Sequence, residues 1–148
     1  MQKDFKLKFE LVPDGCWYSN LRAILSKKQW DFIRQDAKER SGGKCVICGR
    51  TPKRLEAHER WSYDEVNGIQ KLEDVITLCP ACHKTVHIGR SQLMGDGEFC
   101  ENWFMKVNGC TYAEMRAELG KANEEHKRLN KVSEWRLDLT YLKRYVKE

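Results

Sequence analysis

The sequence contains no long apolar run, and this absence excludes a protein that spans a membrane. No segment approaches the roughly 18 consecutive apolar residues that a transmembrane helix needs. No apolar signal segment follows Met1, and no internal repeat or low-complexity segment is present. The 148 residues have ordinary hydrophobic content and suffice for a single domain. We therefore expect a soluble globular protein of the cytoplasm.

Cysteine is abundant by comparison, with seven in the chain. The odd number and the absence of a signal segment argue against a secreted disulfide framework. Four of the cysteines form two Cys-x-x-Cys pairs, Cys45 with Cys48 and Cys79 with Cys82. Both thiolates of such a pair can face one ion, so the two pairs predict a structural zinc site. The other three are expected to be buried packing thiols: Cys16, Cys100 and Cys110.

The net charge of +5 permits a polyanionic partner such as nucleic acid but does not require one. Basic side chains crowd the first cysteine pair and the segment after the second pair. Such a set could follow a phosphate backbone without reading bases, although a solvated charged face is the alternative. The predicted nucleic-acid-binding residues are Arg50, Lys53, Arg54, Arg60, Lys84 and Arg90.

Hydrophobic patterning predicts an α+β domain over residues 1–148, in which residues 1–43 contribute a strand and a helix. Apolar and charged residues alternate over 5–11, which is typical of a half-buried strand. Ser26 and Gln29 form a capping box that opens a helix over residues 27–41.

A mainly helical extension is expected over residues 91–148. Thr111 and Glu114 form a second capping box, which opens a helix to about residue 129. Apolar residues then alternate over 135–139, and this tail is predicted to add a strand beside the N-terminal one.

The central region, residues 44–90, is predicted to be the core of the domain. Strands are expected at 55–61 and 72–78, followed by a helix over 80–88 that Gly89 ends. Because so small a unit cannot bury a large core of its own, zinc would contribute directly to its folding.

Three of the four histidines also fall in this region. His83 and His87 are four residues apart on the predicted helix, so both imidazoles can project from one face toward one ion. With His58 on a nearby strand, they predict a second, open metal site. The alternative is that His83 merely caps or packs and that His87 is a surface residue.

Together these features resemble the HNH endonucleases, in particular their zinc-ribbon branch. The resemblance covers about residues 44–90 and rests on the first cysteine pair, the strand with His58, Leu-Cys-Pro-Ala-Cys-His at 78–83, and His87. It implies a ββα-metal (His-Me finger) core that hydrolyses phosphodiester bonds in DNA. It also implies that His58, His83 and His87 bind a catalytic Mg²⁺, Mn²⁺, Ni²⁺ or Zn²⁺ beside the structural zinc.

The chain departs from the family pattern at two positions that the resemblance makes catalytic. If His58 matches the first member of the family's His-His pair, it binds the metal and Glu59 takes the place of the general base. If it matches the second member, His58 is the base and Ala57 has replaced the ligand; we favour the first alignment. Asp74 stands where the family has asparagine. These departures keep open a second interpretation, an HNH-like zinc module that has lost catalysis and binds nucleic acid or a protein partner.

Overall fold

A long antiparallel hairpin lies at the centre of the fold. The computed structural model describes residues 5–145. In it, β1 (Glu56–Asp64) pairs with β2 (Ile69–Leu78), and the three-residue β3 (Arg136–Asp138) pairs in parallel with β2. The sheet order is β1-β2-β3. Gly68 turns the hairpin with a φ of 66°, and a Cβ there would lie 2.8 Å from the carbonyl oxygen of Glu134, so glycine is required.

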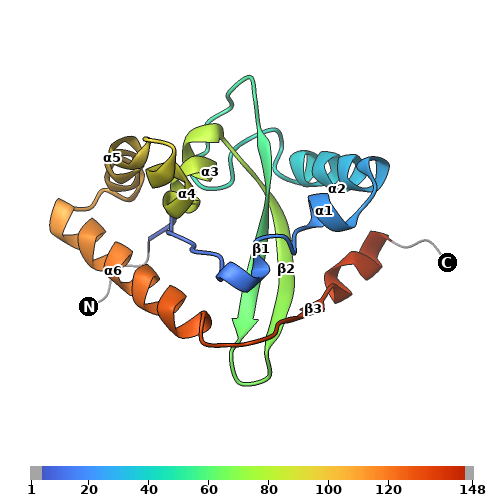
Figure 1. Cartoon of the computed structure of the whole chain (residues 1–148). Helices are drawn as coiled ribbons and strands as arrows, with labels where there is room; N and C mark the ends of the chain where they lie inside the picture. Colours follow the sequence, from blue (N-terminus) through green and yellow to red (C-terminus); the bar gives the residue numbers. More distant parts are fainter. Residues whose placement is uncertain (1–4, 146–148) are drawn as a thin grey trace.

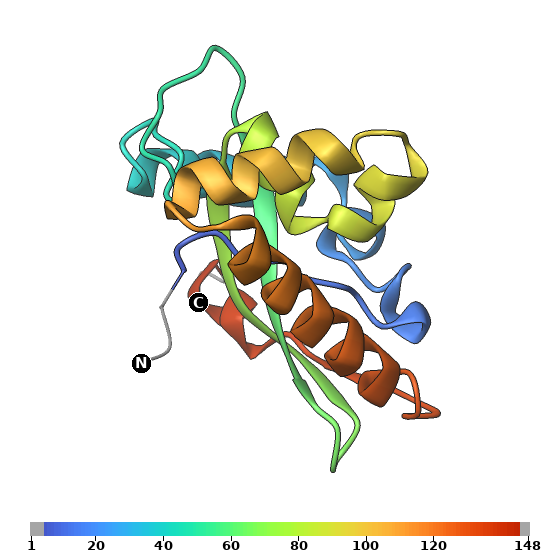
Figure 2. The ribbon, with the colours of Figure 1, turned by 90° about the vertical axis from the view of Figure 1, so that its left-hand side faces the viewer.

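Helices cover both sides of this hairpin, as Figures 1 and 2 show. One side carries four helices: α3 (Pro80–Val86), α4 (Ile88–Leu93), α5 (Gly97–Asn108) and α6 (Tyr112–Leu129). The other side carries two helices and a 3-10 turn: α1 (Leu21–Ile24), α2 (Lys27–Arg40) and η2 (Thr140–Tyr145). A further 3-10 turn, η1, spans Asp14–Cys16. None of the helices within residues 5–145 combines the length and apolar character that crossing a membrane requires.

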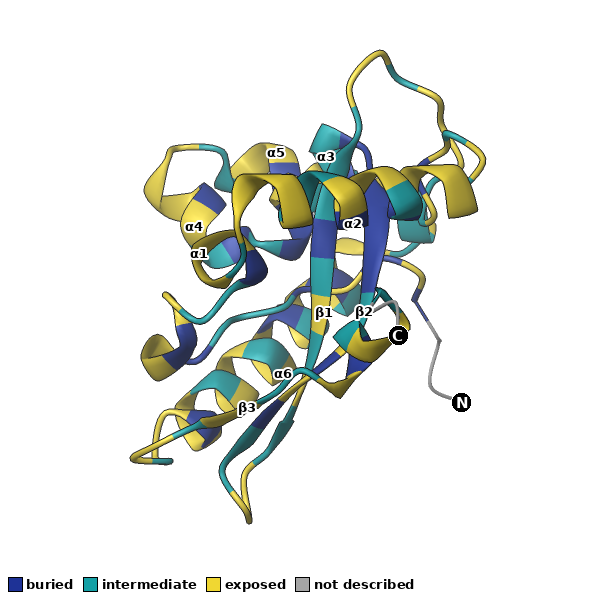
Figure 3. Cartoon of the chain, turned by 90° about the vertical axis from the view of Figure 1, so that its right-hand side faces the viewer, coloured by how far each residue is buried: buried dark blue, intermediate teal, exposed yellow. Residues whose placement is uncertain are grey.

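The hairpin separates two hydrophobic cores. Buried residues follow β2, whereas β1 is mostly of intermediate burial (Figure 3). The first core, on the side of α3 to α6, includes Phe5, Leu7, Phe9, Ile76, Leu78, Val86, Ile88, Phe104, Met115 and Leu119. The second core, on the side of α2, includes Leu21, Ile33, Ala37, Leu72, Val75 and Tyr141. The molecule is therefore a small α+β fold built around a three-stranded sheet.

Both predicted capping boxes are confirmed. The Ser26 side chain accepts a hydrogen bond from the backbone N–H of Gln29, and the Thr111 side chain accepts one from the backbone N–H of Glu114. Each side chain satisfies an N–H group that the first turn of its helix leaves unpaired. α2 and α6 consequently begin where the sequence predicts.

The predicted N-terminal strand is wrong, although its alternating burial is real. Phe5, Leu7 and Phe9 are buried in the first core, but the segment bends at residues 6–7 and forms no strand of the sheet. The side chain of Asn108 on α5 satisfies the Leu7 backbone, accepting from its N–H at 3.0 Å and donating to its carbonyl at 2.9 Å. The alternation of apolar and charged residues therefore predicted which side chains are buried. It did not predict that the backbone bonds to a side chain and not to another strand.

The partner of the tail strand and the end of the helix after β2 also differ from the prediction. The tail strand pairs with β2 and not with the N-terminal segment. Val146, in the predicted extension over residues 91–148, lies outside the described residues. The helix that carries His83, α3, ends at Val86, because His87 leaves the helical conformation with φ −92° and ψ 51°. Gly89 therefore lies inside α4 and does not end a helix.

Candidate metal centres

The four paired cysteines converge on one point. Their sulfur atoms all lie within 4.8 Å of one another, and all of these residues except Cys48 are buried. Cys45 and Cys48 come from the loop before β1. Cys79 directly follows β2 as the N-cap of α3, and Cys82 lies in the first turn of that helix. Four thiolates at this spacing could hold a zinc ion, as the sequence predicts.

Backbone contacts bring the two cysteine pairs together. The Val46 N–H donates to the Thr77 carbonyl at 3.0 Å, which attaches the first pair to the end of β2. The Gly49 N–H donates to the Cys45 carbonyl at 2.9 Å, and Gly49 adopts a φ of 77° that disfavours other residues. The tight turn after Cys48 therefore depends on glycine.

The sulfur cluster already favours charge on one of its members. A hydrogen bond from the Cys82 thiol lowers the pKa of Cys45 to about 4, and the same bond together with burial raises the pKa of Cys82. Trp103 on α5 donates its Nε1–H to Cys82 Sγ at 3.3 Å. Cysteine binds zinc as the thiolate. Donors in the surrounding fold, such as the Trp103 N–H, can hydrogen-bond to these sulfur atoms and orient them.

A second cluster consists of His58, His83 and His87. One ring nitrogen of each lies within 4.8 Å of the others, and the ring centroids are 5.0 to 5.3 Å apart. His58 is buried on β1, His83 lies on α3, and His87 is the residue at which that helix ends. Three converging imidazoles could hold a divalent ion.

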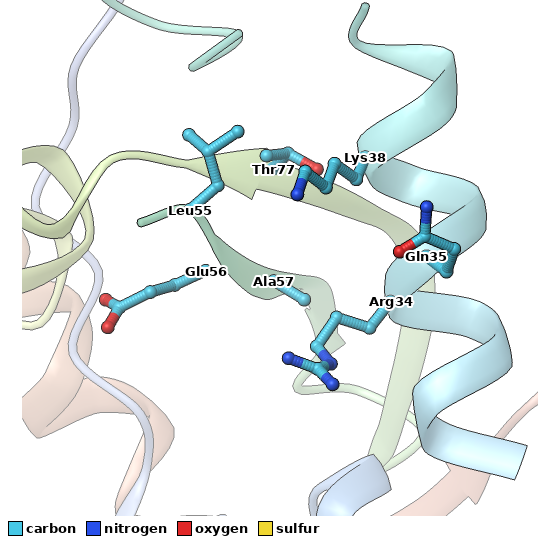
Figure 4. Close-up of a pocket in the computed structure, with 7 residues that line it drawn as sticks. All are labelled: Arg34, Gln35, Lys38, Leu55, Glu56, Ala57 and Thr77. Carbon is cyan, nitrogen blue, oxygen red and sulfur yellow. The ribbon is translucent and has the colours of Figure 1, made fainter. Parts of the chain in front are cut away.

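Two of these histidines are paired with carboxylates. Glu56 Oε1 lies 3.0 Å from His83 Nδ1, and Glu10 Oε2 lies 2.7 Å from His58 Nε2. Figure 4 shows Glu56 at the edge of a pocket of about 90 Å³ beside α2, with its carboxylate directed away from that helix. A carboxylate on the second ring nitrogen is typical of histidines that bind metal, because it fixes the tautomer and the ring orientation.

Burial keeps two of the imidazoles in their metal-binding form. It lowers the pKa of His87 to about 3, with a further contribution from the charges of His58 and His83. Burial also lowers the pKa of His83, although its hydrogen bond to Glu56 opposes the shift. A neutral imidazole has a free lone pair for an ion, so the cluster is suited to a cation.

Glu59 does not join the histidine cluster. On β1 it alternates with His58: His58 pairs with Ile76 of the first core, whereas Glu59 pairs with Val75 of the second. The Glu59 carboxylate accepts a hydrogen bond from the Leu21 backbone N–H at the start of α1. Burial raises the pKa of Glu59. The assignment of this residue as general base therefore needs correction, because its side chain points to the opposite face of the sheet.

Asp74 is also engaged elsewhere. Its Oδ1 accepts a hydrogen bond from the Tyr141 hydroxyl at 2.9 Å and lies 3.6 Å from Arg40 Nη1. These partners belong to η2 and α2, on the side of the second core. The structure thus gives Asp74 a role in tying the C-terminal turn and α2 to β2.

The six predicted nucleic-acid-binding residues are all exposed. Three of them have partners within the chain: Arg54 pairs with Glu56 at 2.9 Å, Lys84 with Asp96 at 3.4 Å, and Arg50 lies over the Trp103 ring. The other three lie in the loop before β1, in β1 and in α4, respectively: Lys53, Arg60 and Arg90.

Sequence reasoning missed Glu10 and Glu56. Glu56 was open to detection, because it stands two residues before His58 on a predicted strand and must share its face. Glu10 carried no such signal, since its contact with His58 spans 48 residues.

Comparisons with protein-family models, with curated proteins and with solved structures found no significant match to this chain. The resemblance to HNH endonucleases therefore stays a prediction. Experiments on the cysteine and histidine clusters can test it.

Proposed function

We propose that the chain is a metal-dependent HNH-type endonuclease that hydrolyses phosphodiester bonds in DNA, and that it acts in the cytoplasm. One observation carries the proposal: His58, His83 and His87 converge from a β-hairpin and the helix that follows it, beside a separate cluster of four cysteines. In this account the cysteines hold a structural zinc and β1, β2 and α3 form the ββα-metal core.

The two clusters suit different tasks. Four cysteines complete a tetrahedral shell and leave no position for a substrate. Three histidines leave positions open, and a divalent ion bound there supplies Lewis-acid stabilisation of the charge that develops on a phosphate. The protein residues orient the ion and hold the backbone of the nucleic acid.

The basic residues supply the expected contacts to phosphate. Arg90 lies close enough to His87 for its charge to help lower the pKa of that imidazole, whereas Lys84, which directly follows His83, pairs with Asp96 at 3.4 Å. Phosphate contacts position a nucleic acid and carry no sequence information themselves. We therefore propose binding to DNA with little dependence on base sequence.

The second candidate is a zinc module of the same architecture that binds nucleic acid or a protein partner and no longer cleaves. The contacts of Glu59 with Leu21 and of Asp74 with Tyr141 favour it. These are the two residues that differ from the HNH pattern, and both form hydrogen bonds that support the fold and lie away from the histidines. In this case the cysteine site persists and the histidines bind no exchangeable ion.

A cleavage assay separates the two candidates. Zinc-loaded protein is incubated with supercoiled plasmid DNA and with RNA, in the presence of Mg²⁺, Mn²⁺, Ni²⁺ or Zn²⁺. The nuclease predicts cleavage that His58→Ala and His87→Ala abolish. His126→Ala is the matched control, because this fourth histidine lies on α6 and pairs with Asp14. If the wild-type protein cleaves neither substrate with any of these ions, the nuclease proposal is wrong.

A further inference from the structure

We propose that Glu10 is a positioning residue of the histidine site, and that its carboxylate orients His58 so that ring nitrogen Nδ1 faces the ion. The inference rests on the proposed function of that site and adds a residue from outside the predicted core of residues 44–90. It assigns to the N-terminal segment the task of completing the metal centre.

The backbone holds Glu10 at the site. Its N–H donates to the Val86 carbonyl at 2.8 Å, directly before His87. The residues on either side anchor the segment: the Phe9 ring stacks on Phe104 with centroids 4.2 Å apart, and Leu11 packs against the first core. Glu10 is therefore fixed beside α3 by contacts that do not involve its own carboxylate.

The carboxylate of Glu10 favours one tautomer of His58. The His58 side chain is only 4% exposed, and Oε2 of Glu10 lies 2.7 Å from its Nε2. A carboxylate accepts hydrogen bonds, so Nε2 carries the proton and the lone pair of the neutral ring lies on Nδ1. That nitrogen is then the one available to an ion shared with His83 and His87.

His83 is held in the complementary way. Its Nδ1 faces Glu56 at 3.0 Å, which leaves Nε2 for the ion. Two carboxylates from different parts of the chain thus fix two of the three ligands. Partners of this kind contribute to metal affinity, and their loss typically weakens binding by about 10- to 100-fold.

Glu10 and Glu56, and not the predicted Glu59, are the carboxylates that contact the histidine cluster. Glu59 is on the opposite face of β1, bonded to Leu21. The negative charge that the site needs near its cation therefore comes from Glu10 and Glu56.

The test uses the full chain with zinc already bound at the cysteines, so that added Co²⁺ reports only the histidine site. Co²⁺ is titrated into wild type, Glu10→Ala and Glu10→Gln, and binding is followed by visible absorption. Glu124→Gln is the control, because its carboxylate lies exposed on α6 and pairs with Lys127. We expect Glu10→Ala to weaken Co²⁺ binding by about 10- to 100-fold. Glu10→Gln, which keeps a hydrogen-bond acceptor of the same size, should weaken it less, and Glu124→Gln should not change it.

Nitrogen-15 NMR of the histidine rings gives a second readout that does not depend on activity or on Co²⁺. The metal-free histidine site should contain His58 with its proton on Nε2 in wild type and Glu10→Gln, and a mixture of tautomers in Glu10→Ala. Equal Co²⁺ affinity in wild type and Glu10→Ala, or a wild-type His58 protonated on Nδ1, would overturn the proposal. If wild type binds no Co²⁺ at all, the proposed ion is wrong, and the tautomers alone decide whether Glu10 orients His58.

Discussion

The Glu59 carboxylate accepts a hydrogen bond from the backbone N–H of Leu21, across the face of β1 opposite to His58. Leu21 is fully buried at the start of α1, where helix N–H groups lack partners within the helix. Glu59 thus supports the junction between α1 and the hairpin.

Replacing Glu59 should therefore affect folding and leave metal binding intact. Glu59→Ala leaves the Leu21 N–H buried without an acceptor, which we expect to lower the free energy of unfolding by about 1–3 kcal/mol. Glu59→Gln retains an acceptor and should cost less. Urea denaturation measures this change, and Glu73→Ala, an exposed carboxylate on β2, is the control. If Glu59→Gln lost the divalent ion at the histidine cluster while its stability stayed unchanged, Glu59 would belong to that site after all.

Asp74→Asn introduces the asparagine that the proposed resemblance to HNH endonucleases places at this position. Because Asp74 contacts Tyr141 and Arg40 on the far side of the sheet, we expect no gain in cleavage rate. Tyr141→Phe removes the same hydrogen bond and should lower the free energy of unfolding by about 0.5–1.5 kcal/mol. A cleavage rate that rises in Asp74→Asn and stays constant in Tyr141→Phe would contradict this role.

Zinc removal tests the cysteine cluster. Its sulfurs lie in the first core, so chelation should unfold the region around α3 and lower the melting temperature. Cys82→Ser should lose the bound zinc, measured by elemental analysis, whereas Cys16→Ala should keep it, because Cys16 is a buried thiol outside the cluster. Full zinc content in Cys82→Ser would refute the site.

The proposed phosphate contacts predict a salt dependence. Each contact that binding makes with DNA contributes about −0.9 to the slope of log K against log salt concentration. Arg90→Ala should weaken DNA binding and reduce the magnitude of this slope by about 0.9, the contribution of one phosphate contact, with little effect on the stability of the fold. Lys127→Ala, on the exposed face of α6, should change neither quantity. An unchanged slope in Arg90→Ala would remove this residue from the interface.

Local features of this fold were predictable, and long-range partners were not. The capping boxes at Ser26 and Thr111 use residues three apart, so the sequence alone locates the starts of α2 and α6. The cysteine cluster was predictable because two-residue gaps constrain sulfur geometry directly. Burial alternation located the buried face of residues 5–11, but the partner of this segment is Asn108, about a hundred residues away.

The histidine site shows the same division. The grouping of His58, His83 and His87 followed from spacing and from the strand–helix pattern. The role of Glu59 failed because adjacent strand residues face opposite sides of a sheet, which the alignment to a His-His pair did not take into account. Glu10 could not be found, because no local pattern links it to His58.

The proposed function requires that His58, His83 and His87 bind a divalent ion separate from the zinc expected at the four cysteines. Crystals of zinc-loaded protein soaked in Mn²⁺ test it most directly, through anomalous scattering recorded at the edges of both metals. We expect a zinc peak among the cysteines and a manganese peak within about 2.0–2.3 Å of one nitrogen from each of His58, His83 and His87. A zinc peak alone, with no manganese among the histidines, would contradict it.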